Sequence, residues 1–312
     1  MNRHLFFVFK LLLTAGLLVG VAMFVDLSDV WNRIRTIHPG WLLAALLCMV
    51  SGYIACGVRW AWIAEGLGIE VSRRKKIQLY FLGMFASMFL PSTIGGDVVR
   101  GVLLAKREGR KGIGMLAGAS VVLDRLNGLF ALTILITLCL LFFEWPAIWW
   151  ASWLAIVGGM WGVMLLLPLL YQRLLPYVPA RLEKLKTLPL LEPRFIRQWW
   201  KSLPVSFVFQ GIVVQAHVFL GTAVGVEMPW PAYAIMMGLV ALATIVPISL
   251  NGFGIREAGY VGFAVYFGAD AGAVTAMAAL WVIVLGISSL PGAIVLWRIG
   301  GFSKLQQENP GS

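Results

Sequence analysis

Charged residues are scarce in this sequence. Asp, Glu, Lys and Arg make up 12% of its 312 residues, whereas hydrophobic residues make up 60%. A typical soluble domain has about 25% charged and about 45–50% apolar residues. So few charges cannot cover the surface of a chain of this length in water, and the composition therefore excludes a soluble globular enzyme. It is typical of a polytopic membrane protein.

Cysteine is also rare, and common catalytic motifs are absent. The three cysteines, Cys48, Cys56 and Cys139, lie in apolar runs without the CxxC spacing of a zinc or redox site. The sequence contains no HExxH, no GxSxG and no Walker phosphate loop. We therefore expect no disulfide framework, no metal and no cofactor, and we expect that the protein is not an enzyme.

Apolar segments divide the chain into candidate membrane spans. A bilayer core about 30 Å thick requires about 20 apolar residues in one helix. Segments that satisfy this length are 5–25, 41–63, 113–143, 149–170, 205–226 and 271–297. Two shorter apolar segments end at prolines, one at Pro91 and the other at Pro247. We predict that these two segments do not cross the membrane.

Clusters of basic residues predict an orientation. The chain has 25 Lys and Arg against 14 Asp and Glu, a net charge of +11, and the basic residues gather at 73–76, 106–111 and 173–201. Cytoplasmic loops carry an excess of Lys and Arg, so we place all three clusters and both termini in the cytoplasm. The first two clusters share a side only if the segment between them enters the membrane and returns. Because orientation accounts for the charge, we expect no nucleic-acid partner.

A similar re-entrant segment recurs later in the chain. Residues 91–100, PSTIGGDVVR, align with residues 247–256, PISLNGFGIR, and Gly112 matches Gly268 at the same offset. Proline ends a helix and glycine adopts backbone angles that other residues resist. The predicted break residues are Pro91, Gly95, Gly96, Pro247, Asn251, Gly252 and Gly254. We expect Asp97 to cap the first returning helix and Asn251 the second.

The predicted fold is all-α, a polytopic integral membrane protein in one domain over 1–312. It has about six full spans and two re-entrant helical hairpins arranged as an inverted repeat, with repeat cores at 77–143 and 231–297 and a basic cytoplasmic loop at 171–204. Inverted repeats with broken helices near the midplane are typical of secondary transporters. The alternative is that both hairpins serve only as packing wedges.

Six ionisable residues are predicted to lie inside the membrane or along the hairpins. They are Asp97, Arg100, Asp124, Arg125, Arg256 and Glu257. A central charge costs about 2.5–3.5 kcal/mol, so these residues are expected to pair or to face water. We expect a neutral network whose arginines bind a lipid phosphate, or a purely structural network. Arg59 is expected to snorkel to the surface, and His217 to bond to a neighbouring helix.

Three segments of the chain resemble the motifs of a known family. Residues 89–100, FLPSTIGGDVVR, residues 120–125, SVVLDR, and residues 247–257, PISLNGFGIRE, are similar to the motifs of the lysylphosphatidylglycerol synthase transmembrane family. The resemblance covers nearly the whole chain and implies movement of lipids between leaflets, with the six ionisable residues as the functional set. The chain resembles a stand-alone member without the soluble aminoacyl-transferase domain, so lysyl transfer is not expected.

The expected function is therefore flippase or scramblase-like transport of an amphipathic, anionic lipid, such as a phospholipid or a polyprenyl-phosphate-linked lipid. The expected location is the cytoplasmic (inner) membrane. The expected partners are membrane lipids, and the sequence is compatible with a homo-oligomer. Two alternatives remain open. One is an intramembrane lipid-modifying transferase that uses Asp97 or Asp124 as a base, and the other is a non-transporting membrane partner protein.

Overall fold

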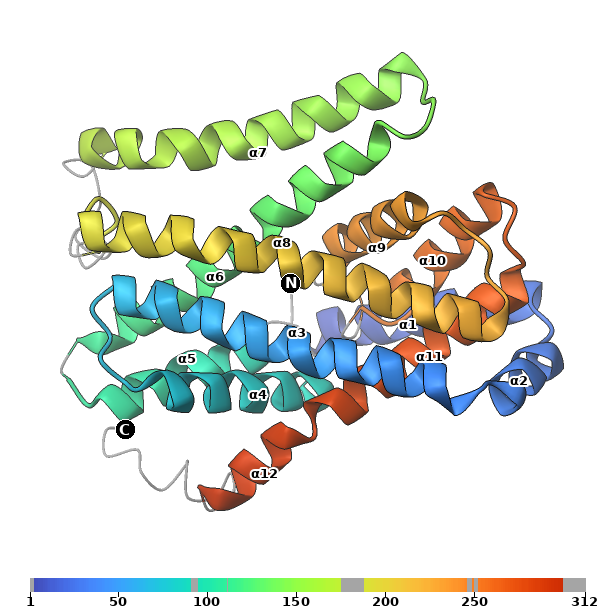
Figure 1. The fold of residues 1–312 in the computed structure, drawn as a ribbon, viewed down its shortest axis with the longest axis horizontal. Helices are drawn as coiled ribbons and strands as arrows, with labels where there is room; N and C mark the ends of the chain where they lie inside the picture. Colours follow the sequence, from blue (N-terminus) through green and yellow to red (C-terminus); the bar gives the residue numbers. More distant parts are fainter. Residues whose placement is uncertain are drawn as a thin grey trace.

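Helices make up the architecture throughout the described part of the chain (Figure 1). The computed structural model describes residues 3–90, 95–110, 112–174, 188–245, 249 and 252–299, with side chains except those of 3–10, 163–165 and 167–174. No strand occurs in these residues, which confirms the all-α class. The predicted break residues Pro91, Pro247 and Asn251 lie outside the described residues.

The helices, in chain order, are α1 Arg3–Phe24, α2 Leu27–Thr36, α3 Pro39–Gly66, α4 Arg73–Phe89, α5 Gly95–Glu108, α6 Ile113–Leu140, α7 Ala147–Leu174, α8 Pro193–Val224, α9 Trp230–Ile245, α10 Ile255–Tyr266, α11 Ala271–Ser289 and α12 Pro291–Arg298. Among the described residues, four spans are long and apolar enough to cross a membrane: α3, α6, α8, and α11 with α12. The chain bends by 85° between α1 and α2. Asp26 is the N-cap of α2 there, and its carboxylate accepts a 2.8 Å hydrogen bond from the Ser28 amide.

Helices α3 and α8 lie side by side across the middle of the bundle (Figure 1). Glycines bring the two helices close together. A Cβ atom on Gly52 of α3 would lie 3.2 Å from the Phe209 ring of α8, and one on Gly66 would lie 3.2 Å from the Phe195 backbone. The predicted loop 171–204 is helical at both ends, because α7 continues to Leu174 and Pro193 starts α8 at a position that favours proline.

Two helical hairpins, α4–α5 and α9–α10, pack against this centre. Helix α4 ends at Phe89 and α9 at Ile245, so each helix stops two residues before a predicted break proline. In Figure 1 the open end of the α4–α5 hairpin lies where α3 ends and α6 begins. The open end of the α9–α10 hairpin lies at the opposite end of the bundle, where α8 ends and α11 begins.

The glycines of the two hairpins serve different purposes. Gly95 and Gly96 belong to helix α5 and do not have a positive φ, so the predicted special backbone angles are wrong for these two residues. Gly96 is needed because a Cβ atom there would overlap the Gly83 carbonyl of α4. In the second hairpin the prediction is confirmed, since Gly252 and Gly254 have φ values of 79° and 82°.

The returning helices are not capped as predicted. Both carboxylate oxygens of Asp97 bind arginine side chains instead of amides of α5. Helix α10 begins after Gly254, whose amide donates a 2.6 Å hydrogen bond to the Glu257 carboxylate. Glu257 therefore satisfies an amide at the start of α10, the task that we predicted for Asn251.

Candidate functional site

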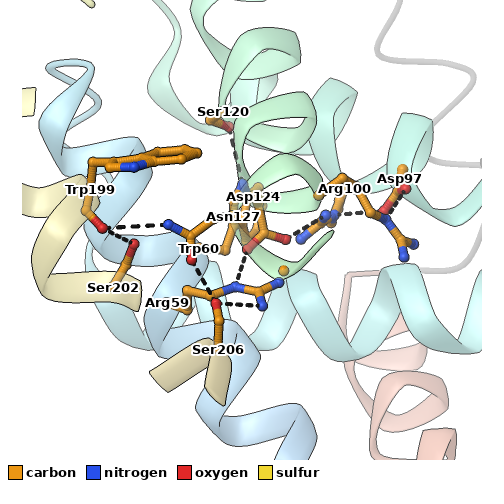
Figure 2. A network of polar contacts seen from close by, with 12 residues as sticks. Arg59, Trp60, Asp97, Arg100, Ser120, Asp124, Asn127, Trp199, Ser202 and Ser206 are labelled. Atoms are coloured by element: carbon orange, nitrogen blue, oxygen red, sulfur yellow. Dashed lines mark hydrogen bonds and ion pairs between the residues drawn. The ribbon is translucent and has the colours of Figure 1, made fainter. Parts of the chain in front are cut away.

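Asp124 is the most deeply buried carboxylate of the site. It lies eleven residues after Ile113, about 16 Å along α6 at the rise of an α-helix, and its side chain is 1% exposed. One carboxylate oxygen accepts a 2.7 Å hydrogen bond from Arg59 Nε, and the other accepts a 2.9 Å bond from Arg100 Nη2 (Figure 2). Two guanidinium groups on different helices, α3 and α5, therefore bind one carboxylate of α6.

Arg100 also binds a second carboxylate. Its Nε donates to Asp97 Oδ1 over 3.0 Å, and Asp97 Oδ2 accepts a 2.7 Å bond from Arg125 Nε. Charges alternate in the order Arg59, Asp124, Arg100, Asp97 and Arg125, and we call these five residues the charge chain. Three cations and two anions leave the charge chain with one uncompensated positive charge.

Close packing of α5 against α6 brings the charge chain together. Asp97 and Arg100 are three residues apart and so share one face of α5. Gly101 lies beside them, and a Cβ atom there would be 3.5 Å from Val121 of α6. A Cβ atom at that distance would make an ordinary van der Waals contact, so α5 lies directly against α6 at Gly101, and the carboxylate of Asp97 reaches Arg125.

Aromatic rings hold Arg100 from the other side. The guanidinium carbon of Arg100 lies 4.8 Å from the centre of the Trp60 ring and 4.9 Å from that of Tyr80. The Trp60 ring is itself held by a 3.0 Å hydrogen bond to Ser120 (Figure 2). Arg100 Nη1 is buried and has no hydrogen-bond partner among the described residues. Cation–π contacts compensate part of that burial, and one N–H donor is left without a partner among the described residues.

The prediction that Arg59 snorkels to the surface is wrong. The residue is buried, and besides Asp124 it donates a 3.1 Å bond to the Ser206 hydroxyl of α8. Ser206 in turn donates a 2.6 Å bond to Asn127 on α6. Arg59 lies seven residues before Gly66, where α3 ends. That separation is about 10 Å along the helix axis, which is too deep for the side chain to reach the surface easily. The predicted span ended at residue 63, so the depth of Arg59 follows from the greater length of α3 in the structure.

Arg256 and Glu257 form a pair of their own. Arg256 donates to Glu257 Oε1 from Nε over 3.0 Å and from Nη2 over 2.7 Å, and its guanidinium carbon lies 4.9 Å from the Phe253 ring centre. In the described part of the chain no hydrogen bond or ion pair joins this pair to the charge chain. The predicted single neutral network of six residues is therefore wrong, because Arg59 completes the first cluster and the second cluster is separate.

His217 has the structural role that we expected. Its Nδ1 lies 2.9 Å from the Val213 carbonyl oxygen, which can only accept, so Nδ1 carries the proton. Nε2 then accepts a 2.9 Å bond from the Tyr260 hydroxyl of α10. Both ring nitrogens are occupied, and His217 joins α8 to the second hairpin. Within the described residues, no group of three or more His, Cys, Asp or Glu side chains is placed to hold a metal ion.

Apolar helices of spanning length around a buried charge chain define a multi-pass membrane protein with a polar site at depth. The chain belongs to the family described as the lysylphosphatidylglycerol synthase TM region, which matches residues 7–292. The resemblance carried by the three motifs is thereby confirmed, and the family relates the protein to lipid handling. No curated protein matches the chain.

Proposed function

We propose that this protein moves an anionic lipid between the two leaflets of the cytoplasmic membrane. The observation that carries the proposal is the position of Arg125. It lies twelve residues after Ile113, about 18 Å along α6, yet 55% of its side chain is exposed. An exposed cation at that depth is costly unless water or an anion reaches it.

A phosphate group fits the open end of the charge chain. Asp97 binds Arg125 through Nε, and neither Nη nitrogen of Arg125 bonds to another described residue. A guanidinium group binds phosphate oxygens through parallel N–H donors, which gives both geometry and strength. In this proposal Arg125 and Arg100 contact the headgroup phosphate, while Asp97 and Asp124 hold the two arginines in place.

The second hairpin supplies Arg256 and Glu257 as the counterpart of this site. In the proposed mechanism these two residues open their pair when a headgroup passes, and the acyl chains stay in the hydrocarbon. The main barrier is loss of water from the phosphate, which fixed arginines lower. Transport is then downhill or coupled to an ion gradient.

The proposed topology has six spans, counting α1 and the 28-residue helix α7, and two re-entrant hairpins in an inverted repeat. The order of elements supports this arrangement, because α4, α5 and α6 correspond in the aligned sequence to α9, α10 and α11 with α12. Matching turns support it as well. Gly112 and Gly268, which align at the same offset as the breaks, have φ values of 81° and 80°.

Cysteine labelling tests this topology. Lys75 in the first turn of α4 and Arg107 at the end of α5 are exposed, and so is Glu227 between α8 and α9. In a background without the native cysteines, Lys75→Cys and Arg107→Cys should both react only from the cytoplasmic side, and Glu227→Cys only from the other side. Labelling of Lys75→Cys and Arg107→Cys from opposite sides would show that the first hairpin crosses the membrane.

Reconstitution tests the function itself. Purified protein in liposomes should exchange a fluorescent phosphatidylglycerol between leaflets, above the rate of protein-free liposomes. Formation of a modified lipid without exchange would support a transferase, and neither result would support a non-transporting partner. The contacts of the two candidate bases favour transport, since both oxygens of Asp97 and both oxygens of Asp124 already bind guanidinium groups, which leaves no carboxylate oxygen free to contact a substrate.

A further inference from the structure

One face of α6 is open from the start of the helix to Arg125. Gly114, Gly118, Val122 and Arg125 are spaced by four, four and three residues, so they lie on one side of the helix. All four are exposed, and a Cβ atom on either glycine would meet no heavy atom within 4 Å. Membrane helices usually present larger apolar side chains to lipid. A helix face with two exposed glycines below an exposed arginine therefore needs an explanation.

Helix α5 continues this open face. Gly101 of α5 lies against Ala117 and Val121 of α6, and Asp97 reaches Arg125, so the two helices run antiparallel along one seam. The buried residues of the charge chain lie on the inner side of the seam, and Arg125 is exposed on its outer side. On the outer side of the seam α5 exposes Val98 and Val102. We call Val98, Val102, Gly114, Gly118, Val122 and Arg125 the outer strip.

Helix α7 leaves the outer strip uncovered. It contacts the far half of α6, where Trp153 donates a 2.9 Å bond to Thr137 and Trp161 stacks on Phe130 with ring centres 3.6 Å apart. From there α7 diverges from α6 toward the end of the bundle where α6 begins (Figure 1). At that end the last turn of α5 contains the exposed Arg107. The exposed Arg110 lies in the connection between α5 and α6. The strip thus runs from a basic surface to Arg125.

We propose that the outer strip is the path along which the headgroup of a monoanionic phosphodiester lipid moves from the basic end of α5 and α6 to Arg125. This inference rests on the proposed function. It adds the leaflet from which the lipid enters, the route that its headgroup takes and the net charge of the lipid. The charge chain has one uncompensated positive charge, which one phosphodiester neutralises. Arg100 Nη1, buried without a partner among the described residues, provides a second donor behind Asp97.

A second copy of the chain is the competing occupant of the outer strip. Glycines spaced by four residues are also a common contact between membrane helices. Such a contact would place an apolar helix over Arg125 and remove the exposed cation from water without an anion beyond Asp97 to balance the excess charge. That costs several kcal/mol, whereas a lipid phosphate supplies the missing charge. The exposed guanidinium therefore favours the lipid.

Blocking the strip tests the route. Leucine at Gly118 enters open space, so Gly118→Leu should fold with an unchanged melting temperature but should reduce exchange of fluorescent phosphatidylglycerol to the rate of protein-free liposomes. Gly159→Leu on α7 is the matched control, because Gly159 is exposed and its Cβ position is equally open. It should keep the exchange rate of the unmodified protein. Fluorescent phosphatidylcholine, which has no net charge, should exchange more slowly than phosphatidylglycerol.

Cysteine accessibility measures the strip without relying on transport. In the cysteine-free background, Gly118→Cys should react with a water-soluble, anionic thiosulfonate added from the cytoplasmic side. Gly159→Cys, which faces hydrocarbon, should not react. Equal reactivity of the two variants would overturn the proposed path.

The outcomes separate the route from the function. Exchange that persists in Gly118→Leu overturns the route and leaves the proposed function standing, whereas no exchange by the unmodified protein overturns both. A smaller oligomer in Gly118→Leu with full exchange, measured by light scattering in detergent, would assign the glycines to a helix contact instead. Equal exchange of phosphatidylglycerol and phosphatidylcholine would overturn the monoanionic preference.

Discussion

Replacing Asp124 with asparagine should destabilise the protein by about 3–5 kcal/mol, because the change leaves buried guanidinium groups without their carboxylate. Asp124 is the partner of Arg59 and one of two partners of Arg100, at 2.7 Å and 2.9 Å. The variant should melt at a clearly lower temperature in detergent, or should fail to accumulate in the membrane. Thermal unfolding followed by tryptophan fluorescence measures the difference.

An exposed carboxylate provides the matched control for this change. Asp270 also pairs with an arginine, Arg33, at 3.1 Å, but 58% of its side chain is exposed. Asp270→Asn should cost no more than about 1 kcal/mol, as is usual for a surface ion pair. The double variant Arg59→Met with Asp124→Asn should recover part of the lost stability, since Arg100 keeps Asp97. Equal melting temperatures for Asp124→Asn and Asp270→Asn would show that the charge chain contributes no stability.

Four of the six predicted spans, 41–63, 113–143, 205–226 and 271–297, correspond to described helices that are long and apolar enough to cross a membrane, because hydropathy and length act locally. A run of apolar residues such as 113–140 has to cross or lie in the bilayer whatever its neighbours are, and the structure places helix α6 there. The proline breaks at 91 and 247 likewise predicted where α4 and α9 end. These features depend on the residues of one segment alone.

Pairing between helices could not be predicted in the same way. Arg59 and Asp124 are 65 residues apart in the chain, and their contact follows from how α3 packs against α6. Gly96 shows the same limit, because its role is the close approach of α5 to the Gly83 backbone and not its own conformation. By contrast, Gly252 was predicted correctly, since a positive φ is a local property of the backbone.

The two clusters differ in how completely their charges are balanced. Arg256 and Glu257 compensate each other, and Glu257 also accepts the Gly254 amide. The charge chain retains one positive charge and ends at a side chain that is half exposed. A cluster built only to hold helices together gains nothing from an excess positive charge and an exposed arginine at that depth. The imbalance therefore favours the first cluster as the place where the anion binds, whereas the balanced second pair opens only when the headgroup passes.

Arg125→Gln should reduce lipid exchange by about 10- to 100-fold, because losing a charged hydrogen bond to phosphate costs about 1.5–3 kcal/mol and 1.4 kcal/mol is tenfold. Stability should change little. Arg125 is exposed, and Asp97 keeps its 3.0 Å bond to Arg100 when Arg125 is lost. Exchange of fluorescent phosphatidylglycerol and thermal unfolding, measured on the same preparation, separate the two effects.

Two further variants show whether the guanidinium itself acts on the lipid. Arg125→Lys keeps the charge but loses the planar pair of donors, so it should exchange lipid at a rate between those of Arg125→Gln and the unmodified protein. Arg35→Gln removes an exposed arginine on α2, whose guanidinium carbon lies 5.8 Å from the Trp31 ring centre, and should leave exchange unchanged. If Arg125→Gln lowers the melting temperature as strongly as Asp124→Asn while exchange per folded protein is unaffected, Arg125 belongs to the structural part of the charge chain. Full exchange in a stable Arg125→Gln protein would remove Arg125 from the lipid path altogether, since no other described residue of the charge chain has an exposed guanidinium.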